Sequence, residues 1–518
     1  MTCSYANENT SQKQPCKKQT ITFHINTIFD ENEPDIIFIH RWANMLHINT
    51  KLITMENESA FFIEKCNKDA TDLAELERHL RSKGFIRSAK VEGDEDLQNI
   101  NVTTWDNWSL LPTMSLGRKG NVNTYSLGIK DTNLFGLGVD AELSSYKNAQ
   151  RKGYKVKASI PLFQKNNNTL KIGFADNDDG QEKAIILNKS FASFHSHNAY
   201  AIGFDDSIQD DTLFQNDDTQ SVFGHESNYK VLNYAWLSDN NDNYTLRYNI
   251  GINQDYHKFS YRSPNDDNNG TLVLPENREY IYPWVGISYI EKDFKKLTNI
   301  HLISQIEDFN HGLRISSTFG FGKDMFREDQ MTLFSIDINK GYEIHEDGLL
   351  LIEASLDSDI FINTENRILA ELSGEYFYTL TDSIGFYLNS HNVYSKNHYL
   401  DRPVTMGGNK RLRGYPLQYQ HGSKSVMFNS ELRYYPQLNI LKLFEVAGVA
   451  FFDAGKAFGE ATAKNIEAGW LQSVGVGLRF FSPHAGKASV IHFDLAFPQS
   501  DNPDMDNFAI RIEAKRSF

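Results

Sequence analysis

Hydrophobic and polar residues alternate with a period of two along most of this chain, from about residue 110 to its end. Clear examples are the segments 137–144, 154–160, 244–253 and 508–515, in which every second residue is apolar. Clusters of turn-forming residues, such as NDDG at 177–180, separate the alternating segments. Alternation of this kind predicts β-strands that have one apolar and one polar face.

The polar faces carry charges in strand after strand, and this distinguishes between three all-β folds. The strands of a β-sandwich are usually about five or six residues long, and its interior could not hold so many unpaired charges. A propeller would show a repeat of roughly 40 residues, and the sequence has none. A transmembrane barrel with a wet lumen accepts charges on its inner face. We therefore expect an antiparallel transmembrane β-barrel over residues 105–518, and we interpret some of nearly twenty candidate strands as extensions above the membrane.

The amino-terminal part has a different pattern. Residues 1–19 are polar and are expected to form a disordered tail. Residues 20–104 predict a small α+β domain with the element order β-α-α-β-β. Its clearest helix spans 71–83, where Asp72 and Glu75 resemble a capping box and Gly84 occupies the position of a C-cap glycine.

Composition and charge narrow the function classes. The 518 residues carry a net charge of −15, which argues against a nucleic-acid partner because phosphate neutralisation needs a basic face. The longest apolar run, 446–452, is too short for a membrane-spanning helix.

The three cysteines form no metal-binding motif; we expect free thiols, with a Cys3–Cys16 disulfide as the alternative. The first residues lack the apolar core of a secretory signal, so we expect an export signal to be missing from this start.

A long segment between two predicted strands, residues 393–424, carries the most specific chemistry. Its glycines and prolines indicate a shaped loop, and it contains Arg413. On the following strands, Glu431 and Asp453 fall on the lumen side, and so do Gly475 and Gly477. If the loop folds into the lumen, the Arg413 guanidinium can form a bidentate pair with one or both carboxylates. The alternative is that each charge is separately solvated in the lumen.

Two motifs in this region resemble those of a known family. LRGY at 412–415 and FFDAG at 451–455 look like the paired loop and strand motifs of the outer-membrane assembly-factor superfamily, which includes the BamA/TamA proteins and the two-partner secretion transporters. The loop motif is usually Val/Ile-Arg-Gly-Phe/Tyr, so Leu412 departs from it, whereas Arg413, Gly414 and Tyr415 match. The strand motif Phe-x-Asp-x-Gly is matched by Phe451, Asp453 and Gly455.

Further segments extend the resemblance over nearly the whole chain. DTNLFG at 131–136 resembles the Asp-x-Asn-x-x-Gly turn of the family, and residues 20–104 are similar to a single polypeptide-transport-associated (POTRA) domain. The chain ends in Phe518, as barrels recognised by the assembly machinery usually do, although Arg516 departs from their pattern.

The resemblance implies a barrel of about 16 strands in the Gram-negative outer membrane, with the POTRA domain in the periplasm. It also implies that the loop plugs the lumen, that Arg413 bonds Asp453, and that client strands pair with an edge of the POTRA domain. The seam where residues 112–117 meet 508–518 would be a lateral gate. Only one POTRA domain fits this chain, fewer than in the best-known members, and this leaves the client open.

The leading hypothesis is an outer-membrane protein insertion or translocation factor, with an unfolded polypeptide and outer-membrane lipid as its partners and a monomeric barrel. The alternatives are a diffusion channel and a transporter of lipid or surface structures on the same scaffold. We expect no enzymatic activity, no cofactor and no metal: no nucleophile motif is present, and His195 and His197 are more typical of a polar loop.

Overall fold

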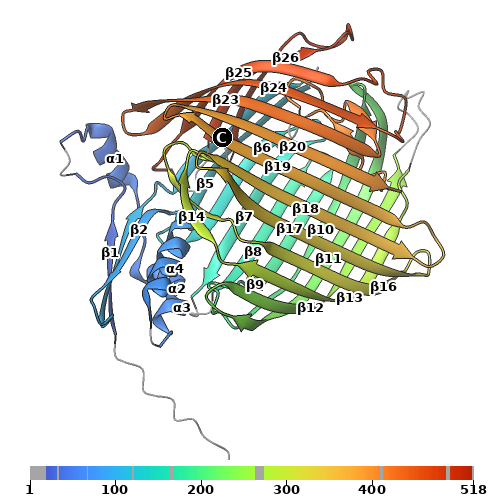
Figure 1. The fold of residues 1–518 in the computed structure, drawn as a ribbon. Helices are drawn as coiled ribbons and strands as arrows, with labels where there is room; N and C mark the ends of the chain where they lie inside the picture. The colour runs from blue at the N-terminus through green and yellow to red at the C-terminus, as the bar shows by residue number, and fades with distance from the viewer. Residues whose placement is uncertain are drawn as a thin grey trace, which may run out of the picture.

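The architecture is that of a closed β-barrel with a small α+β domain at one end (Figure 1). The computed structural model describes residues 19–31, 34–66, 68–119, 122–163, 167–262, 274–408, 412–485 and 490–515. Both the tail 1–18 and Phe518 therefore lie outside the described residues.

The barrel wall has 20 antiparallel strands within the described residues, and it closes where β27 pairs with β4. Its first ten strands are β4 (Leu110–Lys119), β5 (Val122–Leu134), β6 (Val139–Lys147), β7 (Lys152–Leu162), β8 (Asn168–Asn177), β9 (Gly180–Lys189), β10 (Asn198–Gln215), β11 (Asp218–Asn240), β12 (Tyr244–Tyr261) and β13 (Arg278–Glu291). The other ten are β16 (Arg314–Asp324), β17 (Asp329–His345), β18 (Gly348–Phe361), β19 (Arg367–Thr381), β20 (Ile384–Lys396), β23 (Lys424–Ile440), β24 (Phe444–Phe458), β25 (Leu471–Phe481), β26 (Val490–Gln499) and β27 (Ala509–Lys515).

The barrel prediction is confirmed, but the expected number of about 16 strands is wrong. The expectation placed some alternating segments outside the wall as hairpin extensions. In the structure each of them pairs with a strand on both sides, so all contribute to the circumference. Long strands such as β11, with 23 residues, pair with both neighbouring strands over most of their length.

Among the described residues, two pairs of short strands lie outside the wall. The hairpin β14 (Phe294–Thr298) and β15 (Ile306–Asn310) interrupts the connection between β13 and β16. The pair β21 (Val404–Met406) and β22 (Gln420–Gly422) lies within the long segment between β20 and β23. We call residues 397–423 the lumen loop; the expected bounds of 393–424 included the ends of β20 and β23.

The amino-terminal domain contains β1 (Thr20–Asn26), α1 (Phe38–Leu46), α2 (Leu52–Glu58), α3 (Ala60–Ile63), α4 (Ala70–Arg81), β2 (Ile86–Gly93) and β3 (Asn99–Asp106). The strands form a sheet in the order β1-β3-β2, with β1 parallel to β3. Along the chain, one strand before the helices and two after them are as expected, but in the described residues four helices replace the two predicted. Buried Met55, Phe62, Leu76 and Leu80 pack on the sheet residues Ile100 and Val102.

The start of α4 differs from the sequence-based prediction. Asp69 is the N-cap: its carboxylate accepts hydrogen bonds from the Thr71 and Asp72 amides, and Asp72 accepts one from the Asp69 amide at 2.9 Å. The capping box is therefore Asp69–Asp72 and not Asp72–Glu75. At the other end Ser82, and not Gly84, is the C-cap. Free thiols were expected throughout, but Cys66 is disulfide-bonded, so this expectation is wrong for that residue.

No helix in the described part of the chain is both long and apolar enough to span a membrane.

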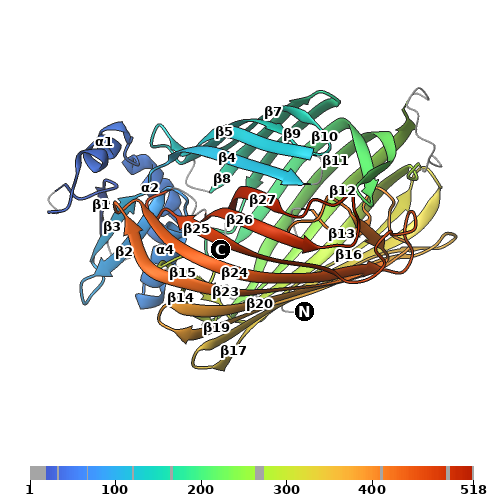
Figure 2. The same cartoon turned by 90° about the horizontal axis from the view of Figure 1, so that it is seen from above.

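The amino-terminal domain is docked on one end of the barrel, which we call the domain end (Figure 2). The turn between β5 and β6 contacts it through Gly136, whose carbonyl accepts hydrogen bonds from the Lys51 amide at 2.9 Å and the Thr54 hydroxyl at 2.8 Å. A Cβ at Gly136 would lie 2.4 Å from the carbonyl oxygen of Asn49, and its φ of +75° also favours glycine. The DTNLFG turn therefore joins the barrel to the domain.

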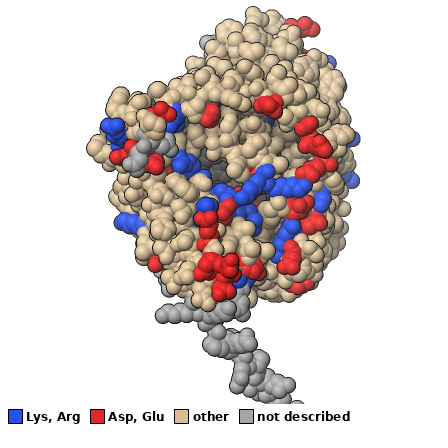
Figure 3. Space-filling model, turned by 60° about the vertical axis from the view of Figure 1, so that its left-hand side comes forward, with Lys and Arg blue, Asp and Glu red and all other residues tan. Residues whose placement is uncertain are grey.

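The docked domain also contacts the rim on the other side of the β27–β4 seam. The Trp108 amide donates to the His484 carbonyl at 2.6 Å in the β25–β26 connection, and His40 Nε2 lies 2.7 Å from the Leu441 carbonyl between β23 and β24. Figure 3 shows this end of the molecule, where charged side chains of both signs gather over the middle of the face.

Candidate functional site: the lumen loop and its acidic partners

The lumen loop returns into the barrel and brings its tip to the inner face of β23 and β24. Residues 409–411 lie outside the described part, and the loop is described again from Leu412 onward. Leu412 is 1% exposed and packs in a cluster with Met406, Met427 and Leu471. Leu412 stands where the motif usually has Val or Ile, and it too supplies a branched apolar side chain to a packed site.

Arg413 is held by both carboxylates that the sequence analysis considered. Its Nε and Nη2 donate to the two oxygens of Asp453 at 2.7 and 2.6 Å, and its Nη1 donates to Glu431 at 3.0 Å. The Arg413 backbone amide adds a bond to Asp453 at 3.2 Å. Asp453 is 1% and Glu431 5% exposed, so the three charges form a buried cluster rather than separately solvated groups.

The flat face of the Arg413 guanidinium lies on the ring of Phe451, with the central carbon 3.4 Å from the ring centroid. Phe451 is 5% exposed and points inward, because it is two residues from Asp453 on the same strand. A cation over an aromatic face is attracted by the ring quadrupole, and the attraction grows when both groups are desolvated. The strand motif therefore supplies both the carboxylate and the aromatic platform for the arginine.

The two glycines of β25 make room for this arrangement. A Cβ at Gly475 would lie 2.2 Å from Cζ of Phe451, and a Cβ at Gly477 would lie 2.4 Å from Oδ1 of Asp494. In β24, a Cβ at Gly455 would lie 2.6 Å from the sulfur of Met406. These three positions thus allow side chains from neighbouring elements to approach the wall.

Gly414 and Tyr415 fix the turn of the loop tip. Gly414 has φ +93°, and a Cβ there would lie 3.1 Å from Cδ of Pro498. The Tyr415 side chain is fully buried, and its hydroxyl lies within hydrogen-bond distance of the carbonyls of Gln472 at 3.1 Å and Gln499 at 2.8 Å. The motif residue thus links the loop to the ends of β25 and β26.

The charge cluster extends toward the domain end through Arg433, which lies two residues after Glu431 on β23. Its Nε donates to Glu431 at 3.0 Å, and its Nη1 donates to the Ile300 carbonyl at 3.0 Å. Ile300 belongs to the segment 299–305 between β14 and β15, so this hairpin reaches into the lumen. Nothing in the alternation of the wall strands indicated the insertion, because it lies between two of them.

A second buried ion pair was missed by the sequence analysis. Arg479 of β25 donates to Asp494 of β26 at 2.6 Å, and Arg511 of β27 donates to the other oxygen of Asp494 at 2.7 Å. Arg479 and Asp494 are 0% and 3% exposed. Asp494 alternates with the apolar residues of β26 and could have been found from that pattern.

The first part of the lumen loop is anchored on the opposite wall. Asp401 accepts two hydrogen bonds from the Arg278 guanidinium of β13, at 3.0 and 2.8 Å, and both side chains are buried. The Tyr399 hydroxyl donates to Asp359 of β18 at 2.8 Å. The loop therefore crosses the lumen and is held on both sides of it.

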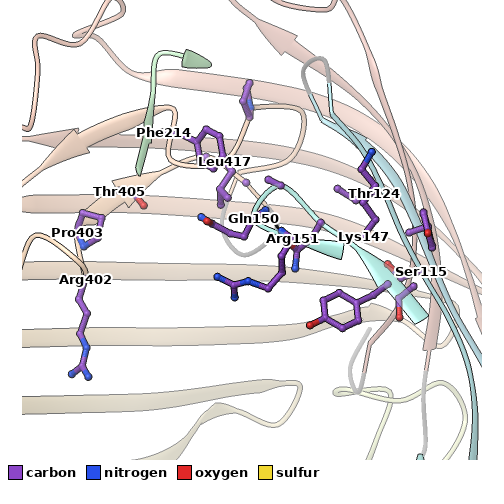
Figure 4. A pocket seen from close by; sticks show the side chains of 18 of the residues that line it. Ser115, Thr124, Lys147, Gln150, Arg151, Phe214, Arg402, Pro403, Thr405 and Leu417 are labelled. Atoms are coloured by element: carbon purple, nitrogen blue, oxygen red, sulfur yellow. Dashed lines mark hydrogen bonds between the residues drawn. The ribbon is translucent and has the colours of Figure 1, made fainter. Parts of the chain in front are cut away.

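A cavity of about 940 Å³ lies between the lumen loop and the strands β4–β7. Figure 4 shows Gln150 and Arg151 between loop residue Arg402 and wall residues Ser115 and Thr124. Arg151 is paired with Asp179 and Asp211, both at 2.9 Å. Within the described part of the chain the lumen is thus only partly filled, and the space that remains is lined by charged and polar side chains together with apolar ones such as Leu369 and Leu417.

His195 and His197 lie at the domain end, in the connection between β9 and β10. His195 Nδ1 is 3.6 Å from a carboxylate oxygen of Glu75 in α4. The pair therefore lies beside the docked domain and apart from the Arg413 cluster.

Comparison with known proteins finds a family match in the carboxyl-terminal region. Residues 356–514 match the family described as the Omp85 superfamily domain. No curated protein sequence matches the chain.

Several solved structures are similar. BamA from Haemophilus ducreyi lacking POTRA domains 1–3 is 12% identical, with 90% of this chain and 82% of that chain covered and a TM-score of 0.36. CdiB from Escherichia coli is 10% identical, with 99% and 93% covered and a TM-score of 0.43. OpdK from Pseudomonas aeruginosa is 11% identical, with 78% and 96% covered and a TM-score of 0.36. Both LRGY and FFDAG lie within the family match, and the protein therefore carries an Omp85 superfamily domain, as these motifs predicted.

Proposed function

We propose that this protein is an insertion or translocation factor of the Gram-negative outer membrane. In this proposal the amino-terminal domain is a POTRA domain in the periplasm. It receives a client polypeptide, which the barrel then inserts into the membrane or exports. The proposal assigns no catalytic step to the chain.

The observation that carries the proposal is the small number of residue pairs that join β27 to β4 in the described part of the barrel, beneath the docked domain. In the described residues β27 pairs with β4 through three residue pairs, 511 with 117, 512 with 116 and 513 with 115. By contrast, β26 and β27 share seven pairs and β4 and β5 share ten. Because fewer backbone pairs lower the cost of opening, we infer from these described pairs that the wall separates most easily here. An open edge is a template for a client strand.

The arrangement of the domain supports the same proposal. In its sheet, β3 is central, so β1 and β2 are the edges. An extended client can add a strand at such an edge through backbone hydrogen bonds. The domain contacts the turn after β5 on one side of the seam and the connection after β25 on the other. A client held there would be close to the seam strands.

A disulfide across the seam tests the gate. Ser115→Cys with Glu513→Cys joins β4 to β27, and Thr318→Cys with Ser335→Cys is the matched control inside the wall. We expect the oxidised seam pair to block insertion or export, reductant to restore it, and the control pair to have no effect. Equal activity of both oxidised pairs would contradict a lateral gate.

The alternative function is a diffusion channel or a transporter of lipid or surface structures, and the partly open lumen favours it. Depletion of the protein in its host distinguishes the insertion or translocation factor from this alternative. We expect a loss of outer-membrane or secreted proteins. If both profiles are unchanged while the uptake or export of small molecules falls, the alternative is correct.

A further inference from the structure

The amino-terminal domain presents a large apolar face that its own fold does not cover. On α1, Phe38, Trp42, Met45 and Leu46 are 77%, 52%, 73% and 52% exposed. They are spaced i, i+4, i+7 and i+8, so they lie on one side of the helix. His40 and Ala43, on the other side, are each 1% exposed, and Ala43 packs in a cluster with Phe29 and with Leu443 of the barrel rim.

The face continues beyond the helix. Ile48, Leu52 and Ile53, which follow α1 and begin α2, are 50%, 52% and 49% exposed. A monomeric soluble protein rarely exposes so many large apolar side chains together, and such a patch marks a site of interaction. Figures 1 and 2 both place α1 at the outer edge of the domain, apart from α4.

We propose that this face lies in the membrane leaflet at the domain end of the barrel, so that α1 is an interfacial, lipid-bound helix. The inference goes beyond the proposed function, because it requires only that the barrel spans a membrane.

Continuity with the lipid-facing surface of the barrel identifies lipid as the occupant. His40 of α1 contacts the Leu441 carbonyl at 2.7 Å, and Leu438, Ile440 and Leu441 at this rim are 50%, 40% and 53% exposed. On the other side, Trp42 packs edge-on against Trp108 with ring centroids 6.4 Å apart. Trp108 leads directly into β4, where Leu110 is 52% exposed. The apolar face therefore joins the belt of the barrel on both sides.

The polar residues around the face are those expected at a membrane surface. Arg41 and Lys51 are exposed beside the apolar residues. Lys442 of the rim lies 3.6 Å from Asp35, just before α1. Long basic side chains at such a boundary keep their charge in the headgroup region while their stems cover apolar surface. Tryptophan is favoured at the same depth, and Trp42 and Trp108 both occur here.

Two other occupants fit less well. A client strand needs a sheet edge with free backbone groups, and the face of a helix offers none. A second copy of the chain would have to cover an apolar surface that merges with the lipid-facing wall. Both are nevertheless outcomes of the test.

The test uses the full chain inserted in vesicles of phosphatidylethanolamine and phosphatidylglycerol, with or without brominated phosphatidylcholine. The difference in emission between the wild type and Trp42→Phe reports on Trp42. We expect this component to be shifted to the blue and to lose intensity in brominated vesicles. Water-like emission without quenching would overturn the proposal.

A matched pair of variants tests whether the whole apolar face, and not Trp42 alone, contacts the lipid. Met45→Asp places a charge in the face, and Ile63→Asp does so at another exposed apolar residue of the same domain, 37% exposed in α3. We expect Met45→Asp to reduce the quenching of Trp42 and Ile63→Asp to leave it unchanged, while both barrels remain folded by circular dichroism. Equal effects would contradict the assignment. A signal that depends on protein density or on added unfolded polypeptide would assign the face to a second copy or to a client instead.

Discussion

Arg413 and Asp453 are joined by three hydrogen bonds at the inner face of the barrel wall, two from the guanidinium and one from the backbone amide. They lie 40 residues apart in the chain, one in a loop and one in the middle of β24. The pair therefore ties the tip of the lumen loop to the wall.

We expect Arg413→Ala and Asp453→Asn each to destabilise the barrel by about 3–5 kcal/mol, because each leaves an uncompensated buried charge. Heat-dependent gel mobility and denaturant unfolding in detergent measure the loss. In the double variant the losses should not add, since one interaction is removed twice. Full additivity would contradict a direct energetic coupling between the two residues.

Gly475→Ala tests the aromatic platform under the arginine. The added Cβ would lie 2.2 Å from Cζ of Phe451 and 2.3 Å from the carbonyl oxygen of Leu495, so the ring must move away from Arg413. We expect a loss of about 1–3 kcal/mol, typical of overpacking, in the same unfolding assay. Gly448→Ala on β24 is the control, since nothing lies within 4 Å of its Cβ position. If both variants unfold alike, steric room at Gly475 does not matter.

The ion pair between Arg81 of α4 and Asp308 of β15 should hold the domain on the barrel. Arg81 donates through Nε at 3.0 Å and through Nη2 at 2.9 Å, and the side chains are only 15% and 18% exposed. Asp308→Ala should weaken the docking by about 1.5–3 kcal/mol, the range for charged hydrogen bonds. Faster hydrogen exchange in α4 would report it.

Lys296→Ala on the same hairpin is the matched control. Lys296 is 58% exposed and 3.3 Å from Glu77, so its loss should cost less than about 1 kcal/mol. An Asp308→Ala protein that exchanges like this control would show that the domain is held by other contacts.

Glu58 should make the domain sensitive to acid. Burial by itself would raise the pKa of Glu58, but the Lys83 ammonium at 2.5 Å and His79 at 3.2 Å outweigh it and lower the pKa to about 2. The ordinary value is 4.5, so the folded state favours the carboxylate. The stabilisation is complete above that value and is lost as the pH falls from about 4.5 toward about 2.

The lost stability is on the order of 3 kcal/mol. Hydrogen exchange in α2 and α4 of the full chain, measured across this pH range, detects it. Glu58→Gln should be less stable near neutral pH and should lose less stability on acidification. A variant that loses stability in parallel with the wild type would show that Glu58 is not the responsible group.

Local features of the structure were predictable from neighbouring residues. The alternation in 244–253 and 508–515 determines which side chains face outward, because successive residues of a strand point to opposite sides. The same rule placed Glu431, Asp453, Gly475 and Gly477 on the inner face. The spacing of charges and caps around residue 70 predicted a helix there, although it shifted the N-cap from Asp69 to Asp72.

Which side chains bind Arg413 and Arg433 could be decided only from the folded structure. The sequence offered Arg413 two carboxylates, and it binds both because the loop tip lies between β23 and β24. The inward reach of the β14–β15 hairpin and its bond from Arg433 were not predictable, since Ile300 and Arg433 are separated by 133 residues.

The sequence by itself determined a β-barrel with a charged interior, a separate α+β domain and a motif-bearing loop, because these depend on residues close together in the chain. Only the tertiary structure decided that 20 strands of the described residues close the wall, that β27 and β4 share three residue pairs there, and that the domain docks on both sides of this seam. Closure joins β27 to β4 across nearly the whole length of the barrel sequence, and the register of such a contact is set by the packing of all the intervening strands.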